Sequence, residues 1–418
     1  MAIRTYTEFS AALHARSVDK RSALAGSIEV TRRCPLVCSH CYNNLPMADR
    51  EARLQELSLE EHHALIDQLF EAGTLWLLYS GGEIFARKDF LDIYTYAHKR
   101  GILVTLFTNG ILITEAIADH LSRFRPFAIE ITLYGRTRET YERVTQVPGS
   151  FDRCMNGIKL LMDRKLPLAL KTVGLTVNKH EIWAMKQLSE ELGLPFKFDS
   201  MINPRIDCSA SPLAVRLAAE EIVELDLADP KRVEGWRKFA AHFSKPIRSG
   251  TDGDEMYHCG GGLNSFAIDP YGNIGICVLS TKETFSIREG RFREGWDVFL
   301  AKTRHKKRTR PTKCDDCAIK AMCGMCPAQG ELEHGDAEKP VEFLCEVAHL
   351  RALALDLLVA PHGPCEFCEG GQHHADLQRK AEALRSRDIA PSASPAPQRK
   401  VLAVLRDEAQ GGGCSSCH

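Results

Sequence analysis

The chain has 418 residues, of which 44% are hydrophobic, and this is enough for two domains with buried cores. Its formal net charge is −1, so no global field favours nucleic acid or an acidic membrane surface. The sequence shows neither a signal peptide nor an apolar run of membrane-spanning length, which predicts a cytoplasmic protein. Disulfides are rare in that compartment, so the 16 cysteines indicate metal binding.

From Ile28 to about residue 200, short β-rich runs alternate with amphipathic helical stretches. The expected strands are Ile28–Val30, Leu75–Ser80, Ile102–Thr108, Phe127–Leu133, Leu168–Thr176 and Pro195–Ser200. Between them, a helix over Leu59–Ala72 should begin with a capping box from Ser58 to Glu61. Another helix over His180–Leu192 should be capped by Asn178 with Glu181. This repetition predicts parallel strands with helices outside them.

Three cysteines follow the first expected strand on one loop, at Cys34, Cys38 and Cys41. Thiolates so close together can hold three corners of a cubane iron–sulfur cluster, whose fourth iron is then free to bind a small molecule. Two alternatives stay open at this point. One is a zinc site, for which His40 is the only nearby fourth ligand, and the other is a disulfide pair with one free thiol.

The C-x3-C-x2-C spacing after a first strand resembles the signature of radical S-adenosylmethionine (SAM) enzymes. The resemblance implies an α/β fold with a partial (β/α)6 TIM-like barrel. It also implies a 4Fe–4S cluster on Cys34, Cys38 and Cys41, with SAM bound to the open iron. One electron from the cluster would cleave SAM to methionine and a 5′-deoxyadenosyl radical. A low-potential electron donor such as flavodoxin or ferredoxin is then an expected partner.

Further turns carry the same resemblance at the carboxyl ends of strands, where α/β proteins bind ligands. Ser80–Glu83 is similar to the family's GGEP motif, with Ile84 in place of proline. Thr108–Gly110 resembles the TNG turn after the third strand, and Thr132 stands where a Ser or Thr commonly meets SAM. The SAM-binding residues that the resemblance implies are His40, Gly81, Gly82, Glu83, Thr108, Asn109 and Thr132.

One departure from the family pattern concerns the SAM carboxylate. Many members carry an arginine at the position that aligns with Thr145. Arg143 and Lys171 are the candidates to compensate for it.

A second cysteine-rich region resembles the SPASM extension of radical SAM enzymes that modify peptides and proteins. It reads C-x12-G-x4-C, then C-x2-C-x5-C-x2-C and a last cysteine, one residue shorter than the family pattern before Cys326. The resemblance implies one auxiliary cluster on Cys314, Cys317, Cys323 and Cys345, and another on Cys259, Cys277 and Cys326. His258, Asp254 or the substrate are candidates for the missing fourth ligand of the second cluster. Zinc in a ribbon-like module is the alternative for the CxxC pairs.

The expected organisation is a lead-in over 1–25, the radical SAM partial barrel over 26–205, a helical bridge over 206–250, the auxiliary-cluster domain over 251–350, a helical CxxC extension over 351–390 and a flexible tail over 391–418. A helix is expected at Leu213–Asp226 in the bridge and another at Cys345–Leu358. Ligand-type residues in the last two segments are Cys365, Cys368, His373, His374, Cys414, Cys417 and His418. Three interpretations of the tail stay open: an inert end, a metal site shared with Cys365 and Cys368, and a tethered cysteine-bearing substrate.

These motifs predict an enzyme that modifies a ribosomally synthesised peptide or protein by hydrogen abstraction. The peptide is the expected substrate, and a separate leader-binding protein is a candidate partner. Enzymes of haem or tetrapyrrole biosynthesis are the alternative in the same superfamily, and a non-redox zinc-stabilised binding protein is the alternative from another class. Val278 stands where sulfatase-maturating relatives carry an aspartate, which disfavours that branch. The sequence indicates no acid–base catalytic residue.

Overall fold

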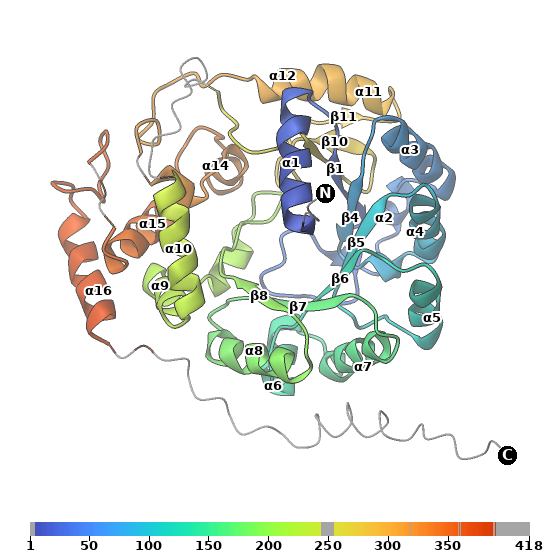
Figure 1. Ribbon diagram of the computed structural model, residues 1–418, viewed down its shortest axis with the longest axis horizontal. Coiled ribbons are helices and arrows are strands. Elements are labelled where there is room, and N and C mark those ends of the chain that lie inside the picture. Colours follow the sequence, from blue (N-terminus) through green and yellow to red (C-terminus); the bar gives the residue numbers. More distant parts are fainter. Residues whose placement is uncertain are drawn as a thin grey trace.

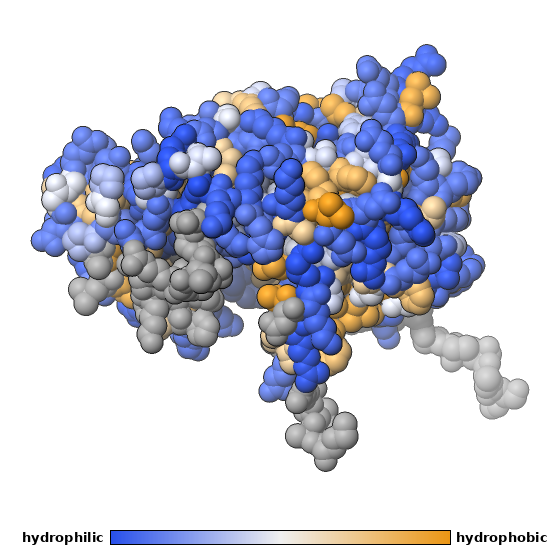
Figure 2. All heavy atoms as spheres, turned by 90° about the horizontal axis from the view of Figure 1, so that it is seen from above, coloured by the Kyte–Doolittle hydropathy of each residue, from blue (hydrophilic) through white to orange (hydrophobic). Residues whose placement is uncertain are grey.

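The structure is a computed structural model that describes residues 5–243, 255–317, 319–357, 359, 361–387 and 389. The expected tail over 391–418 lies outside the described residues, and so does Asp254. No helix within the described ranges is long and apolar enough to cross a membrane. Figure 2 shows a largely hydrophilic surface on one face, with apolar residues in small scattered groups.

A single nine-stranded sheet forms the framework, in the order β11-β10-β9-β1-β4-β5-β6-β7-β8. Six neighbouring strands are mutually parallel: β1 (Ala25–Thr31), β4 (Trp76–Gly81), β5 (Leu103–Thr108), β6 (Ala128–Thr132), β7 (Leu168–Val173) and β8 (Phe196–Asp199). They occupy the six expected positions, with ends shifted by a few residues. The strands follow one another in chain order and the sheet does not close, so the expected partial barrel is confirmed.

Helices cover the outer side of this sheet (Figure 1). They are α3 (Leu59–Glu71), α4 (Phe90–Lys99), α5 (Glu115–Arg123), α6 (Arg138–Thr145), α7 (Ser150–Asp163) and α8 (Ile182–Glu191). Side chains of a strand alternate between its two faces. On β6, Ile129 and Ile131 are buried in the apolar core, whereas Glu130 and Thr132 lie on the opposite face, which lines the inside of the barrel.

The cysteine-rich region extends the barrel sheet, which the sequence did not indicate. Strand β9 (Ser265–Ile268) pairs in parallel with β1. Strands β10 (Asn273–Gly275) and β11 (Phe285–Ser286) then continue the sheet with antiparallel pairing. Nothing local in these short runs specifies a partner so distant in the chain, and therefore periodicity alone could not reveal the pairing.

Of the two expected helix caps, one is confirmed and one is wrong. The hydroxyl of Ser58 accepts a bond from the Glu61 N–H at 3.1 Å, and the Glu61 carboxylate accepts one from the Ser58 N–H at 2.7 Å. Asn178 makes no cap, because its amide bonds the Leu175 N–H at 2.8 Å and the carbonyl of Tyr134 at 3.1 Å. The chain enters α8 through a 3-10 turn over Lys179–Glu181 instead.

The bridge is also less regular than expected. The helix expected at Leu213–Asp226 is divided into a 3-10 turn, Ser211–Val215, and helix α9 (Ala219–Leu227), and helix α10 (Pro230–Phe243) follows. The break lies at Arg216, whose guanidinium donates to the carbonyl of Ile202 at 2.8 Å.

The C-terminal helices α15 (Glu342–Ala354) and α16 (His374–Ser386) pack beside α9. Helix α15 ends at Ala354, four residues before the expected end at Leu358. The buried carboxylate of Asp226 pairs with Arg351 at 2.8 Å and with Arg232 at 2.6 Å, which ties α15 to the bridge.

Shorter elements complete the described chain: α1 (Tyr6–Asp19), β2 (Arg33–Cys34), β3 (Leu45–Pro46), α2 (Arg50–Gln55), the 3-10 turn η1 (Ile84–Ala86), α11 (Phe292–Glu294), the π-helical turn η4 (Gly295–Leu300), α12 (Ala301–Arg304), α13 (Lys320–Cys323) and α14 (Pro327–His334).

The buried carboxylate of Glu181 gives the first testable prediction. It accepts bonds from the Arg136 N–H at 2.6 Å, the Thr137 hydroxyl at 2.7 Å and the Thr140 hydroxyl at 2.8 Å. Burial alone would raise the pKa of Glu181, but these bonds hold it below the ordinary value. Replacing Glu181 by glutamine should lower the free energy of unfolding at pH 7 by about 1–3 kcal/mol, because the three buried donors named above lose a charged acceptor.

Urea denaturation under anaerobic conditions measures this loss. A group with a lowered pKa stabilises the fold above its unfolded-state pKa, and that contribution disappears as the pH falls through the folded-state value. The difference between wild type and Glu181→Gln should therefore shrink in acid. Glu190→Gln, on an exposed part of α8, is the matched control and should change stability by less than about 0.5 kcal/mol. Equal effects of the two substitutions would contradict the assignment.

Candidate functional site

The loop with Cys34, Cys38 and Cys41 lies at the carboxyl end of β1 and carries three free thiols. Burial raises the pKa of Cys34 to about 12. Burial is also the main cause of the raised pKa of Cys38, and the neighbouring Cys41 and Cys34 raise it further. The three sulfurs are thus close enough to interact electrostatically. Burying three thiolates together requires compensating positive charge, which the iron ions of a cluster supply, so the donor set fits a cubane.

Backbone contacts hold this loop against the barrel. The N–H of Val37 donates to the carbonyl of Thr145 at 3.0 Å, and the N–H of Ser39 donates to that of Val144 at 3.2 Å. The guanidinium of Arg205, after β8, donates to the carbonyl of Cys41 at 3.2 Å. Arg205 is a site-positioning residue that sequence reasoning missed, because no motif surrounds it.

A buried ion pair supports the start of the same loop. The guanidinium of Arg33 donates two bonds to the carboxylate of Glu56, both at 2.9 Å. On β1, the Glu29 carboxylate accepts hydrogen bonds from the Tyr42 hydroxyl at 2.8 Å and from the Asn43 amide at 2.6 Å. These contacts fix both ends of the cysteine loop to β1 and to the segment before α3.

The Gly81–Gly82 turn packs directly on the cysteine loop. Gly81 has a φ of +132°, and a Cβ there would lie 2.1 Å from the carbonyl oxygen of Thr31. A Cβ on Gly82 would lie 2.4 Å from the carbonyl oxygen of Arg32. Only glycine lets the two turns approach so closely, and the Gly82 N–H donates to the Thr31 carbonyl at 2.8 Å.

Glu83 joins the turn after β4 to the turn after β5. Its buried carboxylate accepts bonds from the Thr108 hydroxyl at 2.7 Å and from the Asn109 N–H at 2.8 Å. Burial raises the pKa of this carboxyl, although the same bonds partly offset the effect. The amide of Asn109 in turn lies 3.5 Å from the Cys34 sulfur. Four of the sequence-predicted site residues therefore form one connected group.

The remaining predicted SAM contacts lie around this group. The ring of His40 stacks at a tilt on Tyr134, with centroids 5.1 Å apart, and its buried Nδ1 has no hydrogen-bond partner. Thr132 ends β6 and is in register with Lys171 on β7. Thr145 is fully buried, and its hydroxyl is 2.8 Å from that of Ser150.

Lys171 faces the inside of the barrel within a group of charged residues. Its ammonium lies 3.2 Å from the carboxylate of Glu130, which Lys197 also contacts at 2.7 Å. Burial lowers the pKa of Lys171 to about 8. These lysines line a cavity of about 830 Å³ that extends from β7 and β8 to Trp236 and Cys323.

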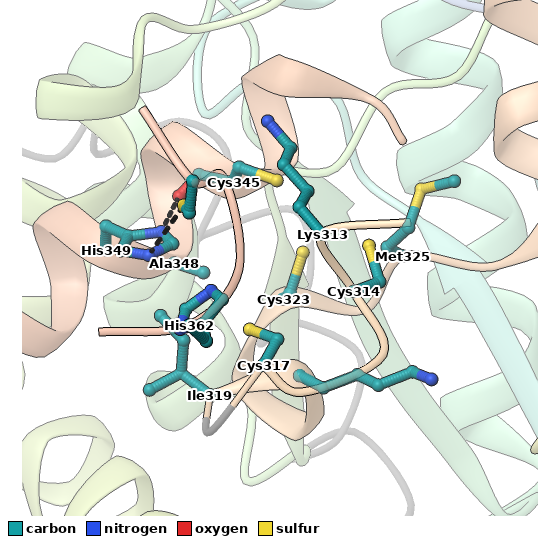
Figure 3. Close-up of a pocket in the computed structure, with 12 residues that line it drawn as sticks. Lys313, Cys314, Cys317, Ile319, Cys323, Met325, Cys345, Ala348, His349 and His362 are labelled. Atoms are coloured by element: carbon teal, nitrogen blue, oxygen red, sulfur yellow. Dashed lines mark hydrogen bonds between the residues drawn. The ribbon is translucent and has the colours of Figure 1, made fainter. Parts of the chain in front are cut away.

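The C-terminal cysteines that the resemblance assigns to clusters lie in two places. Cys314, Cys317, Cys323 and Cys345 surround one pocket (Figure 3). Burial raises the pKa of Cys317 to about 12, with smaller contributions from Cys314 and Cys345. The other group is also close in space, because Cys277 and Cys259 contribute to the raised pKa of Cys326 after burial.

Cys365 and Cys368 are buried, but the histidines singled out beside them lie elsewhere. The Nδ1 of His374 is 3.0 Å from the carbonyl oxygen of Phe367, and His373 lies beside Gln372. The ligand-type side chains near the two thiols are instead His349 and His362. The expected partners Cys414, Cys417 and His418 lie outside the described residues. A signal for His349 was available, since it follows Cys345 by one helical turn.

Comparison with curated proteins identifies relatives of two kinds. The AdoMet-dependent heme synthase of Methanosarcina barkeri is 27% identical over 325 residues, which cover 74% of this chain and 92% of that protein. The antilisterial bacteriocin subtilosin biosynthesis protein AlbA of Bacillus subtilis is 25% identical over 325 residues, which cover 73% of this chain and 68% of that protein.

The fold is similar to a solved structure of Streptococcus suis SuiB bound to its precursor peptide SuiA. The TM-score is 0.60 at 16% identity, and the match covers 81% of this chain and 80% of SuiB. Residues 28–188, which contain the three-cysteine loop and the turns after β4, β5 and β6, match the model of the radical SAM superfamily. The chain therefore contains a radical SAM domain over these residues, and it is an enzyme.

Proposed function

We propose that this enzyme modifies a ribosomally synthesised peptide or protein by hydrogen abstraction. The observation that carries the proposal is the gathering of Cys34, Cys38 and Cys41 at the carboxyl end of β1, beside the turns that follow β4 and β5. A 4Fe–4S cluster held there, when bound, supplies the electron that cleaves SAM to methionine and a 5′-deoxyadenosyl radical.

The chain's own residues would bind and orient SAM. We assign the amine of SAM to the backbone of Gly81–Gly82 and to Glu83, whose carboxylate also holds Thr108 and Asn109 in place. His40 and Thr132 complete the proposed SAM site. Buried side chains surround the thiols, and this exclusion of water protects a reactive radical from side reactions.

Two observations support a peptide as the substrate. The similar proteins include AlbA, named for bacteriocin biosynthesis, and SuiB, solved with a precursor peptide. The cavity of about 830 Å³ lies between strands β7 and β8 and Cys323, so a segment bound there could contact the first auxiliary cysteine group. We propose 4Fe–4S clusters at both auxiliary groups, which would accept an electron or bind the substrate.

Tetrapyrrole chemistry is the second candidate. The match to the heme synthase covers 92% of that protein. Lys171, Lys197, Arg232 and Arg351 line the cavity, and basic side chains could receive the carboxylates of a porphyrin. Two carboxylates, Glu130 and Asp226, pair with these four cations and offset only part of their charge.

The iron content tests the proposed central cluster. Anaerobically reconstituted protein should hold about four more irons than a Cys34→Ala/Cys38→Ala/Cys41→Ala variant, because three thiolates hold one cubane. The variant should also lose production of 5′-deoxyadenosine, measured by chromatography. Cys208→Ala, which removes an exposed thiol, is the control and should change neither quantity. SAM cleavage that survives the triple substitution would refute the assignment.

The affinity for SAM tests the role of Glu83. Glu83→Ala should weaken SAM binding roughly tenfold, about 1.4 kcal/mol, because it removes a proposed ligand and releases Asn109. Equilibrium dialysis with reconstituted protein measures the affinity, and the iron content should stay at the wild-type value. Glu115→Ala on the exposed side of α5 is the control. Unchanged SAM binding in Glu83→Ala would leave the turn with a purely structural role.

A porphyrin titration separates the two substrate classes. Coproporphyrin III added to the reconstituted enzyme should leave the Soret band unshifted if the cavity binds a peptide. A saturable shift that disappears in a Lys171→Gln/Lys197→Gln variant would instead support tetrapyrrole chemistry and contradict the peptide proposal.

A further inference from the structure

Two cysteines and two histidines outside the expected cluster ligands lie together beneath helix α15. They are Cys365, Cys368, His349 and His362, all buried, and their ligand atoms all lie within 4.8 Å of one another. His349 comes from α15, whereas the other three come from the loop between α15 and α16. Figure 3 shows both histidines beside the pocket of the first auxiliary cysteine group.

The distances between these atoms fit a single tetrahedral ion. Zinc–sulfur bonds of about 2.3 Å and zinc–nitrogen bonds of about 2.0–2.1 Å at tetrahedral angles place sulfur and nitrogen about 3.6 Å apart. The Nε2 of His349 is 3.6 Å from the Cys365 sulfur and 3.5 Å from the Cys368 sulfur. The Nδ1 of His362 is 3.4 Å from the Cys368 sulfur.

Hydrogen bonds alone do not account for this arrangement. The Nδ1 of His349 lies 2.7 Å from the carbonyl oxygen of Cys345, and only its N–H can make that bond. The Nε2 is then an unprotonated acceptor with one lone pair, yet two sulfurs lie at similar distances from it. An ion shared by all three atoms satisfies that lone pair. A ligating histidine commonly donates its other N–H to a carbonyl in this way.

The loop that carries Cys365 and Cys368 forms a short turn, which brings the two thiols close together. The N–H of Cys368 donates to the carbonyl of Cys365 at 3.4 Å, and the N–H of Gly371 donates to the carbonyl of Cys368 at 2.8 Å. A Cβ on Gly371 would lie 2.4 Å from the carbonyl oxygen of Glu366, so the turn needs glycine there. The Lys313 ammonium fastens it to the auxiliary region through the Glu366 carboxylate at 2.7 Å.

We propose that His349, His362, Cys365 and Cys368 bind one structural zinc ion. Two thiolates and two imidazoles form a closed, electrically neutral site with zinc, and such a site leaves no position open for substrate. Iron–sulfur clusters are held mainly by thiolates, so the two imidazoles favour zinc over a further cluster. The ion joins the loop to α15 and, through His349, supports the backbone at Cys345.

The experiment uses the full-length protein, purified anaerobically from cells grown with added zinc and reconstituted with iron. Elemental analysis should find about one zinc per chain in addition to the iron. Absorption at the zinc edge should show two sulfur neighbours at about 2.3 Å and two nitrogen neighbours at about 2.0–2.1 Å. The iron clusters do not contribute to that spectrum. The measurement uses the wild-type protein, so it does not depend on whether a variant folds.

Variants then locate the ion. Cys365→Ser/Cys368→Ser should reduce the zinc content to less than about a tenth of the wild-type value, since two of the four ligands are lost. His362→Cys should keep the zinc and change its neighbours to three sulfurs and one nitrogen. The matched control is His373→Ala, which removes an exposed histidine of the same segment and should leave the zinc unchanged.

Four results would overturn the proposal. The wild-type protein could contain no stoichiometric zinc, or iron could occupy these four ligands in its place. The zinc could have four sulfur neighbours, which would assign it to the auxiliary cysteines instead. Full retention of zinc in the Cys365→Ser/Cys368→Ser variant would have the same consequence.

Discussion

The close approach of the turn after β4 to the cysteine loop is the constraint on which the site depends. The Gly81–Gly82 backbone lies so near to Thr31 and Arg32 that no side chain fits between them. Glu83 follows this turn, and its buried carboxylate accepts hydrogen bonds from the Thr108 hydroxyl and the Asn109 N–H. The ends of three strands are thereby joined by direct hydrogen bonds. An unpaired donor or acceptor at this depth would be costly, so these contacts fix the turns relative to one another.

The sequence predicted what local patterns encode. Alternation of strands and helices located all six parallel strands, and the spacing of Cys34, Cys38 and Cys41 located the central group. It could not show that β9 extends the sheet beside β1 or that Arg205 holds the cysteine loop, because such contacts join distant segments. The error at Asn178 has the same origin. Its side chain accepts a hydrogen bond from the Leu175 N–H after β7 and donates one to the carbonyl of Tyr134. A capping motif in the sequence does not reveal such competing partners.

The walls of the large cavity carry four basic side chains that pair with two carboxylates. Glu130 pairs with Lys171 and Lys197 on the barrel strands, while Asp226 pairs with Arg232 and Arg351 on the opposite wall. The four basic side chains outnumber the two carboxylates, so these contacts offset only part of their charge and the lining stays polar with an excess of basic groups. Polar groups of this lining could bond the backbone amides of a peptide, and its excess basic side chains could pair with acidic groups of the same substrate.

Helix α15 connects the groups of the C-terminal region that we propose to bind metal. Cys345 and His349 are four residues apart, so they lie on one side of the helix, and the His349 imidazole bonds the Cys345 carbonyl. At its other end the helix is anchored by the ion pair of Arg351 with Asp226, next to the cavity. A shift of α15 would thus disturb the proposed zinc ligand, the proposed cluster ligand and the cavity wall together. Because a closed zinc site resists such a shift without taking part in redox chemistry, it would hold Cys345 in place if the proposed neighbouring cluster exchanges electrons.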